Sequence, residues 1–200
     1  MASIKLQGDT SGELTISAPA VAGTNTLTLP ASTGTVLTDT APKAGNILQV
    51  LQSVKTDTFS TTSQTLVDVS DLSVTITPTS TSSKILVHMD LMVAVSFHLG
   101  GLQLVRDTTN IYQGDAASNR TRFTIAIGIP PNSDGYNQRS SAMFLDSPNT
   151  TSATTYKIQA INRVDAQGGT MYINRTEQDR DTVGYDPRGV SSITVMEVAG

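Results

Sequence analysis

The chain of 200 residues contains no cysteine and no tryptophan, and only 4% of its residues are aromatic. Without cysteine the protein can form neither disulfides nor thiolate zinc sites. Its stability must therefore come from elsewhere, and oligomerisation is the obvious source. With so few aromatic residues, the core must consist of Val, Ile, Leu, Thr and Ala. Such a core suits a narrow β-sandwich, or a contact between subunits on a threefold axis, better than a ligand pocket.

Charge is also scarce. Charged residues make up 15% of the chain and the net charge is −4, whereas about 25% charged residues is usual in soluble domains. No stripe of lysine and arginine is present to follow phosphates, which argues against nucleic-acid binding. No apolar run approaches the roughly 20 residues that span a bilayer, so membrane insertion is not expected. Residues 1–6 lack the apolar core of a signal peptide, and we expect cytoplasmic synthesis without one.

What the sequence does contain is many short strand patterns. Its 8 prolines and 15 glycines fall at intervals, which indicates turns rather than disorder. The strongest pattern is 84–97, where the odd positions are all apolar and the even positions are mixed. One side of this strand should face the core and the other partly a neighbour, such as a subunit. Roughly eight to ten strands without a convincing amphipathic helix predict an all-β fold, an antiparallel jelly roll or β-sandwich.

The secondary structure of one further segment and the position of another have to be inferred. Residues 47–54 contain two apolar patterns, one with helical spacing (Ile47, Val50, Leu51, Val54) and one that alternates (Leu48, Val50, Gln52, Val54). Ser and Thr crowd the following residues and no helix cap is clear, so we favour a strand through about Phe59. The last pattern is 191–198, and the chain ends two residues later. We therefore expect this strand to lie inside a sheet.

The first 44 residues differ from the rest of the chain. Their strand patterns are very short, and each offers only two or three apolar residues between turn signals. A single hairpin is marginally stable, so other copies of the chain are the simplest source of further strands. We therefore assign 1–44 to an attachment and trimerisation arm of an intertwined homotrimer, and 45–200 to a sandwich head. The apolar residues expected to form the arm are Leu14, Ile16, Leu27, Leu29 and Val36.

The two histidines, His88 and His98, lie on one face of the strongest strand pattern. His88 and Asp90 are neighbours on that face and would offer two metal ligands, which symmetry would multiply on a threefold axis. A half-exposed polar face at a subunit contact is favoured over such a metal site. No cofactor and no resident metal are expected.

Catalytic patterns are weak. A Ser-His-acid triad would need a nucleophile elbow, and no Gly-x-Ser-x-Gly is present. Glu177, Asp179, Asp181 and Asp186 cluster as the paired carboxylates of a glycosidase would. They alternate with arginines and lack the aromatic platforms on which sugars stack, so a solvated charged loop is favoured. We expect that the chain is not an enzyme.

The segment 174–189 is the most interesting surface loop. It is long, and it mixes arginine, aspartate and tyrosine without apolar anchors. Long loops on a rigid sandwich are where binding is usually located. The candidate binding residues are Arg175, Arg180, Tyr185 and Arg188, although a plain excursion of the chain is an equal alternative.

Several segments resemble virion surface proteins of tailed bacteriophages. The segments 14–19, 22–30 and 33–37 resemble a repeat in tail-fibre and other virion surface proteins. The head domain of short fibre proteins from phages of aquatic bacteria is similar to 48–50, 55–60, 72–78, 82–87 and 191–197. The resemblance implies a homotrimer with tumour-necrosis-factor-like jelly-roll heads and a slender N-terminal attachment segment. No catalytic residue is carried over.

Three functions follow as hypotheses. The first is a short trimeric tail fibre on the virion surface, made in the host cytoplasm, whose arm binds other virion proteins. Its head would contact a host surface glycan or protein. The second is a capsid decoration protein pinned to the capsid by the arm, and the third is a virion-associated glycan hydrolase.

Overall fold

The structure is a computed structural model that describes residues 3–8, 10–17, 20–21, 23–24, 42–96, 99–128, 136–163, 169–182 and 184–200. The chain divides into two compact units, Met1–Leu37 and Thr38–Gly200. We call the second unit the head. The boundary predicted after residue 44 stays a prediction. Every regular element in the described residues is a strand, which confirms the all-β prediction. A helix long and apolar enough to cross a membrane is not found among these residues.

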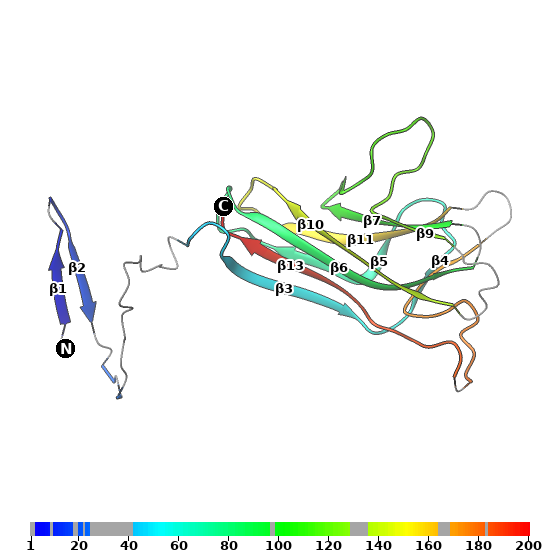
Figure 1. Ribbon diagram of the computed structural model, residues 1–200, viewed down its shortest axis with the longest axis horizontal. Helices are drawn as coiled ribbons and strands as arrows, with labels where there is room; N and C mark the ends of the chain where they lie inside the picture. The colour runs from blue at the N-terminus through cyan, green and yellow to red at the C-terminus, as the bar shows by residue number, and fades with distance from the viewer. Residues whose placement is uncertain are drawn as a thin grey trace. The chain divides into compact units, whose positions relative to one another are not determined.

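The first sheet of the head is built around the strand that the sequence indicates most strongly. Its strands are β3 (Ile47–Lys55), β4 (Phe59–Thr61), β6 (Lys84–Val95), β10 (Gln138–Asp146), β12 (Met171–Ile173) and β13 (Ser191–Val198). Val93 of β6 pairs with β10 along one edge and with β12 along the other. β13 also pairs with β6, while β3 and β4 pair with β13 and β12. The order across the sheet is therefore β3/β4, β13/β12, β6, β10 (Figure 1).

The second sheet is also antiparallel. Its strands are β5 (Val67–Ile76), β7 (Leu99–Arg106), β8 (Thr109–Ile111), β9 (Ile125–Gly128) and β11 (Thr154–Arg163). β11 lies between β5 and β7, and β8 and β9 pair one after the other with the far edge of β7. The order is thus β5, β11, β7, β8/β9.

The strand order is that of a jelly roll. Following β3, β5, β6, β7, β9, β10, β11 and β13 along the chain, the first sheet holds the first, eighth, third and sixth strands. The second sheet holds the second, seventh, fourth and fifth. This interleaving of two sheets is the double Greek key typical of jelly rolls. β13 lies between β3 and β6, so the expectation that the last strand is internal is confirmed.

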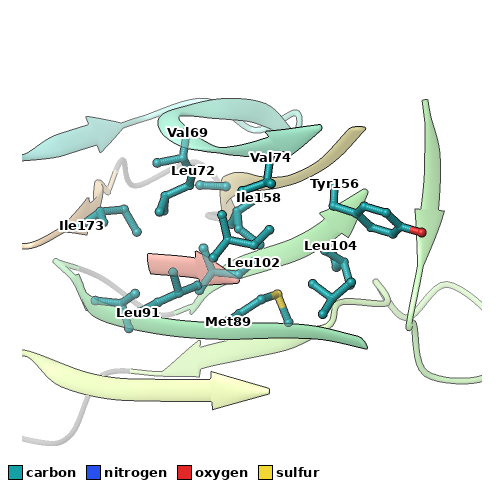
Figure 2. Close-up of a cluster of buried hydrophobic side chains, with 14 of the residues drawn as sticks. Val69, Leu72, Val74, Met89, Leu91, Leu102, Leu104, Tyr156, Ile158 and Ile173 are labelled. Carbon is teal, nitrogen blue, oxygen red and sulfur yellow. The ribbon is translucent and has the colours of Figure 1, made fainter. Parts of the chain in front are cut away.

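The core lies between the two sheets and is mostly aliphatic, but it also contains Met89, Met171 and Tyr156, which the composition did not predict. The alternate residues of β6 that face it are almost completely buried, namely Ile85, Val87, Met89, Leu91, Val93 and Val95. Figure 2 shows Met89 and Leu91 of this strand facing side chains of the second sheet, among them Leu102 and Ile158. The predicted apolar face is therefore the core face. Phe97, which the prediction included in the strand, lies outside the described residues.

A polar network closes one end of this core. The buried Tyr156 donates its hydroxyl to Asp146 Oδ2 at 2.7 Å, and Figure 2 shows this hydroxyl directed away from the apolar cluster. Arg106 donates to both carboxylate oxygens of Asp146, at 2.8 and 2.9 Å. Burial, and then the hydrogen bond to Asp146, raise the pKa of Tyr156, so the phenol stays protonated. The three side chains satisfy one another and allow β10, β11 and β7 to bury polar atoms here.

Residues from 47 onward form a strand, as predicted, but the strand does not continue unbroken to Phe59. β3 ends at Lys55, and β4 begins only at Phe59. Because β3 is at the edge of its sheet, Ile47 and Leu51 stay exposed although Leu51 pairs with the buried Val195. Apolar residues on both sides of an edge strand produced the competing helical spacing.

The described part of the first unit is a single hairpin. β1 (Ser3–Gln7) pairs with β2 (Glu13–Ser17) in an antiparallel register that places Ile4 opposite Ile16 and Leu6 opposite Leu14. All four apolar side chains are on one face, and they are 48–63% exposed. The opposite face is polar and includes an ion pair of 2.8 Å between Lys5 and Glu13. The hairpin is therefore amphipathic, with an uncovered apolar face.

Candidate functional site

The loop between β12 and β13 is held in place by a buried asparagine at its start. Asn174 adopts a φ of 63°, in the left-handed region that asparagine tolerates better than most residues. Its Nδ2 donates to the carbonyl oxygens of Lys55 and Asp57 at 2.8 and 2.9 Å. Ser191, the first residue of β13, donates its hydroxyl to Asn174 Oδ1 at 2.6 Å. One side chain thus joins both ends of the loop to the turn between β3 and β4.

A buried lysine supports the same turn. The side chain of Lys55 is fully buried, and its Nζ donates to Asp57 Oδ1 at 2.7 Å and to Ser70 Oγ at 2.9 Å. Asp71 Oδ2 lies 3.6 Å away. The hydrogen bond from Lys55 lowers the pKa of Asp57. A buried ammonium group is costly unless it is paired, so these partners fix the base on which the loop rests.

Within the loop, a buried carboxylate organises the backbone. Asp186 accepts a hydrogen bond from the hydroxyl of Thr176 at 2.6 Å and a second from Arg180 Nε. These hydrogen bonds, led by that from Arg180, lower the pKa of Asp186. The same Thr176 hydroxyl accepts from the backbone N–H of Asp179 at 3.2 Å. The early and late halves of the loop are thereby joined.

A second ion pair crosses the loop. Arg188 binds Asp179 with two hydrogen bonds, Nε to Oδ1 at 3.0 Å and a terminal nitrogen to Oδ2 at 2.6 Å. This pairing raises the pKa of Arg188. Arg175 lies 3.7 Å from the same carboxylate, and it stacks on Tyr172 with its guanidinium carbon 4.9 Å from the ring centre. It also donates to the carbonyl oxygens of Thr176 and Glu177 at 3.0 Å each.

These contacts leave a hollow on the surface of the loop. Its volume is about 520 Å³, and it is lined by Asp179, Arg180, Asp181, Thr182, Tyr185, Asp186 and Arg188. Tyr185 is 65% exposed, and the guanidinium of Arg180 lies 5.4 Å from its ring centre. Three of the four predicted binding residues, Arg180, Tyr185 and Arg188, therefore come together at one hollow. Arg175 is not among its lining residues and packs on Tyr172 instead.

Both arginines that line the hollow are already paired with carboxylates. An anionic ligand would therefore have to compete with Asp186 for Arg180 and with Asp179 for Arg188. The general acid of a glycosidase needs a raised pKa, and the lowered pKa of Asp186 does not suit Asp186 to that role. The exposed ring of Tyr185 can stack on a ligand. The side chains of the two ion pairs can form hydrogen bonds with it.

His88 lies on the outward side of β6, opposite Thr194 of β13 and Met143 of β10. Asp90, its proposed partner in a metal site, instead forms an ion pair of 2.8 Å with Arg139. Groups of three or more metal-ligating side chains are not found among the described residues. His98, the other histidine of the prediction, is outside these residues.

The side of the first sheet that faces away from the core carries exposed apolar side chains, and we call it the outer face. Four of its side chains are 46–55% exposed, namely Val50 and Val54 of β3 and Met143 and Leu145 of β10. Between them several outward positions of β6 and β13 are half-buried, among them Leu86, Met92 and Met196. This continues the apolar surface across all four strands.

The remaining arm residues are only partly described. Leu14 and Ile16, two of the residues predicted to form the arm, lie on the apolar face of the hairpin. Leu27, Leu29 and Val36 fall outside the described residues. The hairpin nevertheless provides, in the first unit, an uncovered apolar surface comparable in kind to the outer face.

Comparison with known proteins gives no family. No protein-family model and no curated protein matches the chain. Among solved structures, a chain of the infectious bursal disease virus Gt strain is similar, with 12% sequence identity and a TM-score of 0.36. The similarity covers 97% of this chain and 50% of the viral chain. T=1 particles derived from infectious bursal virus match at 15% identity and a TM-score of 0.35, over 97% and 44%. The chain spans about half the length of these proteins, and TM-scores of this size assign it neither their fold nor their function.

Sequence reasoning did not identify the residues that hold the loop. Asn174 and Lys55 are far apart in sequence, and neither stands out by composition. The one signal for Asn174 is its type, since a left-handed backbone favours asparagine and glycine. The outer face was only partly anticipated, from the mixed even positions of β6.

Proposed function

We propose that the chain is a structural, non-enzymatic component of a bacteriophage virion, namely a short homotrimeric tail fibre. In this proposal the N-terminal unit binds other virion proteins and the three copies to one another, and the head contacts the host surface. The sequence resemblance to phage fibre proteins supports this assignment. A jelly-roll head with a mostly aliphatic core is consistent with it.

The observation that carries the proposal is the apolar face of the hairpin formed by β1 and β2. Ile4, Leu6, Leu14 and Ile16 share one face and are half-exposed or more. A two-stranded sheet with an uncovered apolar face is marginal in water, whereas three or more strands that share such a face are stable. Three copies of the hairpin, each turning this face inward, would supply the missing strands. The polar face with Lys5 and Glu13 would then face solvent.

The head contact is assigned to the β12–β13 loop. Its hollow presents Tyr185 beside Arg180 and Arg188 on a backbone fixed by Asn174 and Lys55. Because Arg180 and Arg188 are already held by carboxylates, binding here would cost these two side chains little reorganisation. The loop would therefore present a rigid, polar surface with one exposed aromatic ring to a host glycan or protein.

Labelled virions test this proposal. Gold-conjugated antibodies raised against the head would be applied to purified particles of the phage that carries the chain. We expect gold at the tail. Gold spread over the capsid would contradict a tail fibre and indicate a decoration protein. If intact particles stay unlabelled and mass spectrometry does not find the chain in them, the virion assignment is overturned.

A further inference from the structure

We propose that the outer face of the first sheet is the surface on which heads of neighbouring copies of this chain pack together. The inference rests on the proposed function in one respect, that the arm brings several copies into one assembly. It adds a specific contact between heads, which the arm alone does not require.

The first argument is the apolar surface that the strand register builds. Met196 of β13 pairs with Val50 of β3 and with Leu86 of β6, and Leu86 pairs in turn with Leu145 of β10. An apolar row thus runs from one edge of the sheet to the other. Met143 extends it on β10, and its side chain is 55% exposed. Contiguous apolar patches of this kind on soluble proteins mark interaction sites.

The second argument is that four polar side chains of the face are already paired with one another. Gln52 donates to Thr194 at 2.8 Å across the boundary between β3 and β13. Arg139 forms an ion pair of 2.8 Å with Asp90 between β10 and β6. Covering these groups leaves fewer polar atoms without a partner than covering unpaired ones would. The face is therefore suited to burial under another protein surface.

The third argument concerns charge, and it favours a second copy as the occupant. Of the Asp, Glu, Lys and Arg side chains, only Lys84, Asp90 and Arg139 occupy described outward positions on β3, β6, β10 and β13, and the last two form an ion pair. Lys84 lies at the end of its strand. A strongly charged face would need an oppositely charged partner, whereas a nearly neutral face can meet a copy of itself without repulsion.

The size of the face also favours a second copy of the chain as its occupant. Four strands about 4.8 Å apart and some seven residues long give an area on the order of 400 Å². An interface between freely diffusing partners usually buries about 800 Å² on each side, so this face alone is small. Copies already joined by their arms have an effective concentration in the mM range, at which a weak contact is filled. A face of this size thus fits tethered copies better than an independent partner.

Cysteine labelling of the full chain tests the inference, because the protein has no cysteine of its own. Met143→Cys and Val50→Cys place a single thiol on the outer face, at positions more than half exposed in one chain. Ser73→Cys places a matched thiol on β5, at an exposed position of the other sheet. Each variant would be assembled, checked for mass in native buffer and treated with a maleimide. We expect both outer-face thiols to react about tenfold more slowly than the control, because a thiol in a contact reacts only when the contact opens.

The outcomes separate this inference from the proposed function. A trimeric mass with outer-face thiols that react as fast as Ser73→Cys would overturn the head contact and leave the trimeric fibre intact. A mass of one chain with fast-reacting thiols would overturn both. Thiols that are protected in intact virions but not in the isolated assembly would assign the face to another virion protein, which also contradicts packing between copies.

A charged variant gives a second readout that does not depend on thiol chemistry. Met143→Lys adds a positive charge to the centre of the β10 side of the outer face, and Ser73→Lys adds the same charge to the control position. We expect Met143→Lys to open the heads, so that Val50→Cys in the same chain regains the labelling rate of the control. An unchanged slow rate would contradict a contact through this face.

Discussion

Asn174 donates its side-chain amide to the backbone carbonyl of Lys55 at 2.8 Å, across 119 positions of sequence. This contact joins the start of the β12–β13 loop to the end of β3. Because Asn174 also binds Asp57 and Ser191, one side chain decides where the loop leaves the sandwich. The point at which the loop leaves the sandwich is therefore set by contacts with the end of β3, the following turn and the start of β13.

Replacing this asparagine should loosen the head. Asn174→Gly retains a residue that accepts a φ of 63° but removes three hydrogen bonds. We expect it to lower the free energy of unfolding by about 3 kcal/mol, at about 1 kcal/mol for each bond. Asn174→Ala should lose about 1 kcal/mol more, because a β-carbon disfavours the left-handed region. Urea unfolding at one fixed protein concentration measures both, and a loss no larger than that of an exposed serine would contradict the anchoring role.

The stability of the head should fall in acid. Glu197 accepts hydrogen bonds from Gln49 at 2.6 Å and from the backbone and side chain of Thr79 at 2.7 Å. Burial alone would raise the pKa of Glu197, but these hydrogen bonds, led by that from Gln49, outweigh it and hold the pKa below its ordinary value of 4.5. The unfolded chain therefore binds this proton at a higher pH than the folded head does. The stabilisation is present above about pH 4.5 and is lost as the pH falls through the folded-state pKa.

Thermal unfolding between pH 7 and pH 3 measures this effect. The midpoint should drop on the acid side, and Asp57, Asp68 and Asp186 add to the drop because their pKa values are also lowered. Glu197→Gln should start from a lower midpoint at pH 7 and should lose less of it in acid. A midpoint that rises as the pH falls would be incompatible with these hydrogen bonds.

Host contact through the loop should depend on Tyr185. Its ring is 65% exposed and has no role in the core, so Tyr185→Ala should leave the unfolding free energy within about 0.5 kcal/mol of the original. Binding of the fluorescently labelled protein to host cells should fall about tenfold, since removing an aromatic anchor at a contact typically costs more than 1 kcal/mol. Tyr136→Ala is the matched control, because Tyr136 is also exposed but does not line the hollow. Equal binding by both variants would contradict a host contact through this loop.

The hairpin should hold the copies together through one face only. Leu6→Lys places a charge on the apolar face, whereas Gln7→Lys places the same charge one residue away on the polar face, opposite Glu13. We expect Leu6→Lys to dissociate the assembly and Gln7→Lys to leave its mass unchanged. Sedimentation at equal concentrations compares the two. Dissociation by both variants, or by neither, would show that the apolar face of the hairpin is not the contact.

The sequence predicts the core well because its signal is local. The alternation from Ile85 to Val95 can be followed within one strand, and it correctly separates the core side of β6 from the other side. The strand at 47–55 was harder to predict, because Ile47 and Leu51 are apolar although they stay exposed at a sheet edge. That exposure depends on which strand pairs with β3, which is not encoded near β3 itself.

The candidate site depends on pairings that the sequence does not determine. Arg175, Arg180 and Arg188 could be predicted as a charged loop, but their carboxylate partners could not, because several aspartates are within reach of each. The structure pairs Arg188 with Asp179 and Arg180 with Asp186, and the ring of Tyr185 stays exposed beside them. The outer face needs the register of four strands before its apolar row can be recognised.

The central claim is that the chain acts as a homotrimer held by its N-terminal hairpin. The most direct test is the mass of the full-length protein in native buffer, by native mass spectrometry at micromolar concentration. We predict a species of about three times the chain mass of 21.1 kDa. A single species with the mass of one chain, across the accessible concentration range, would contradict the claim.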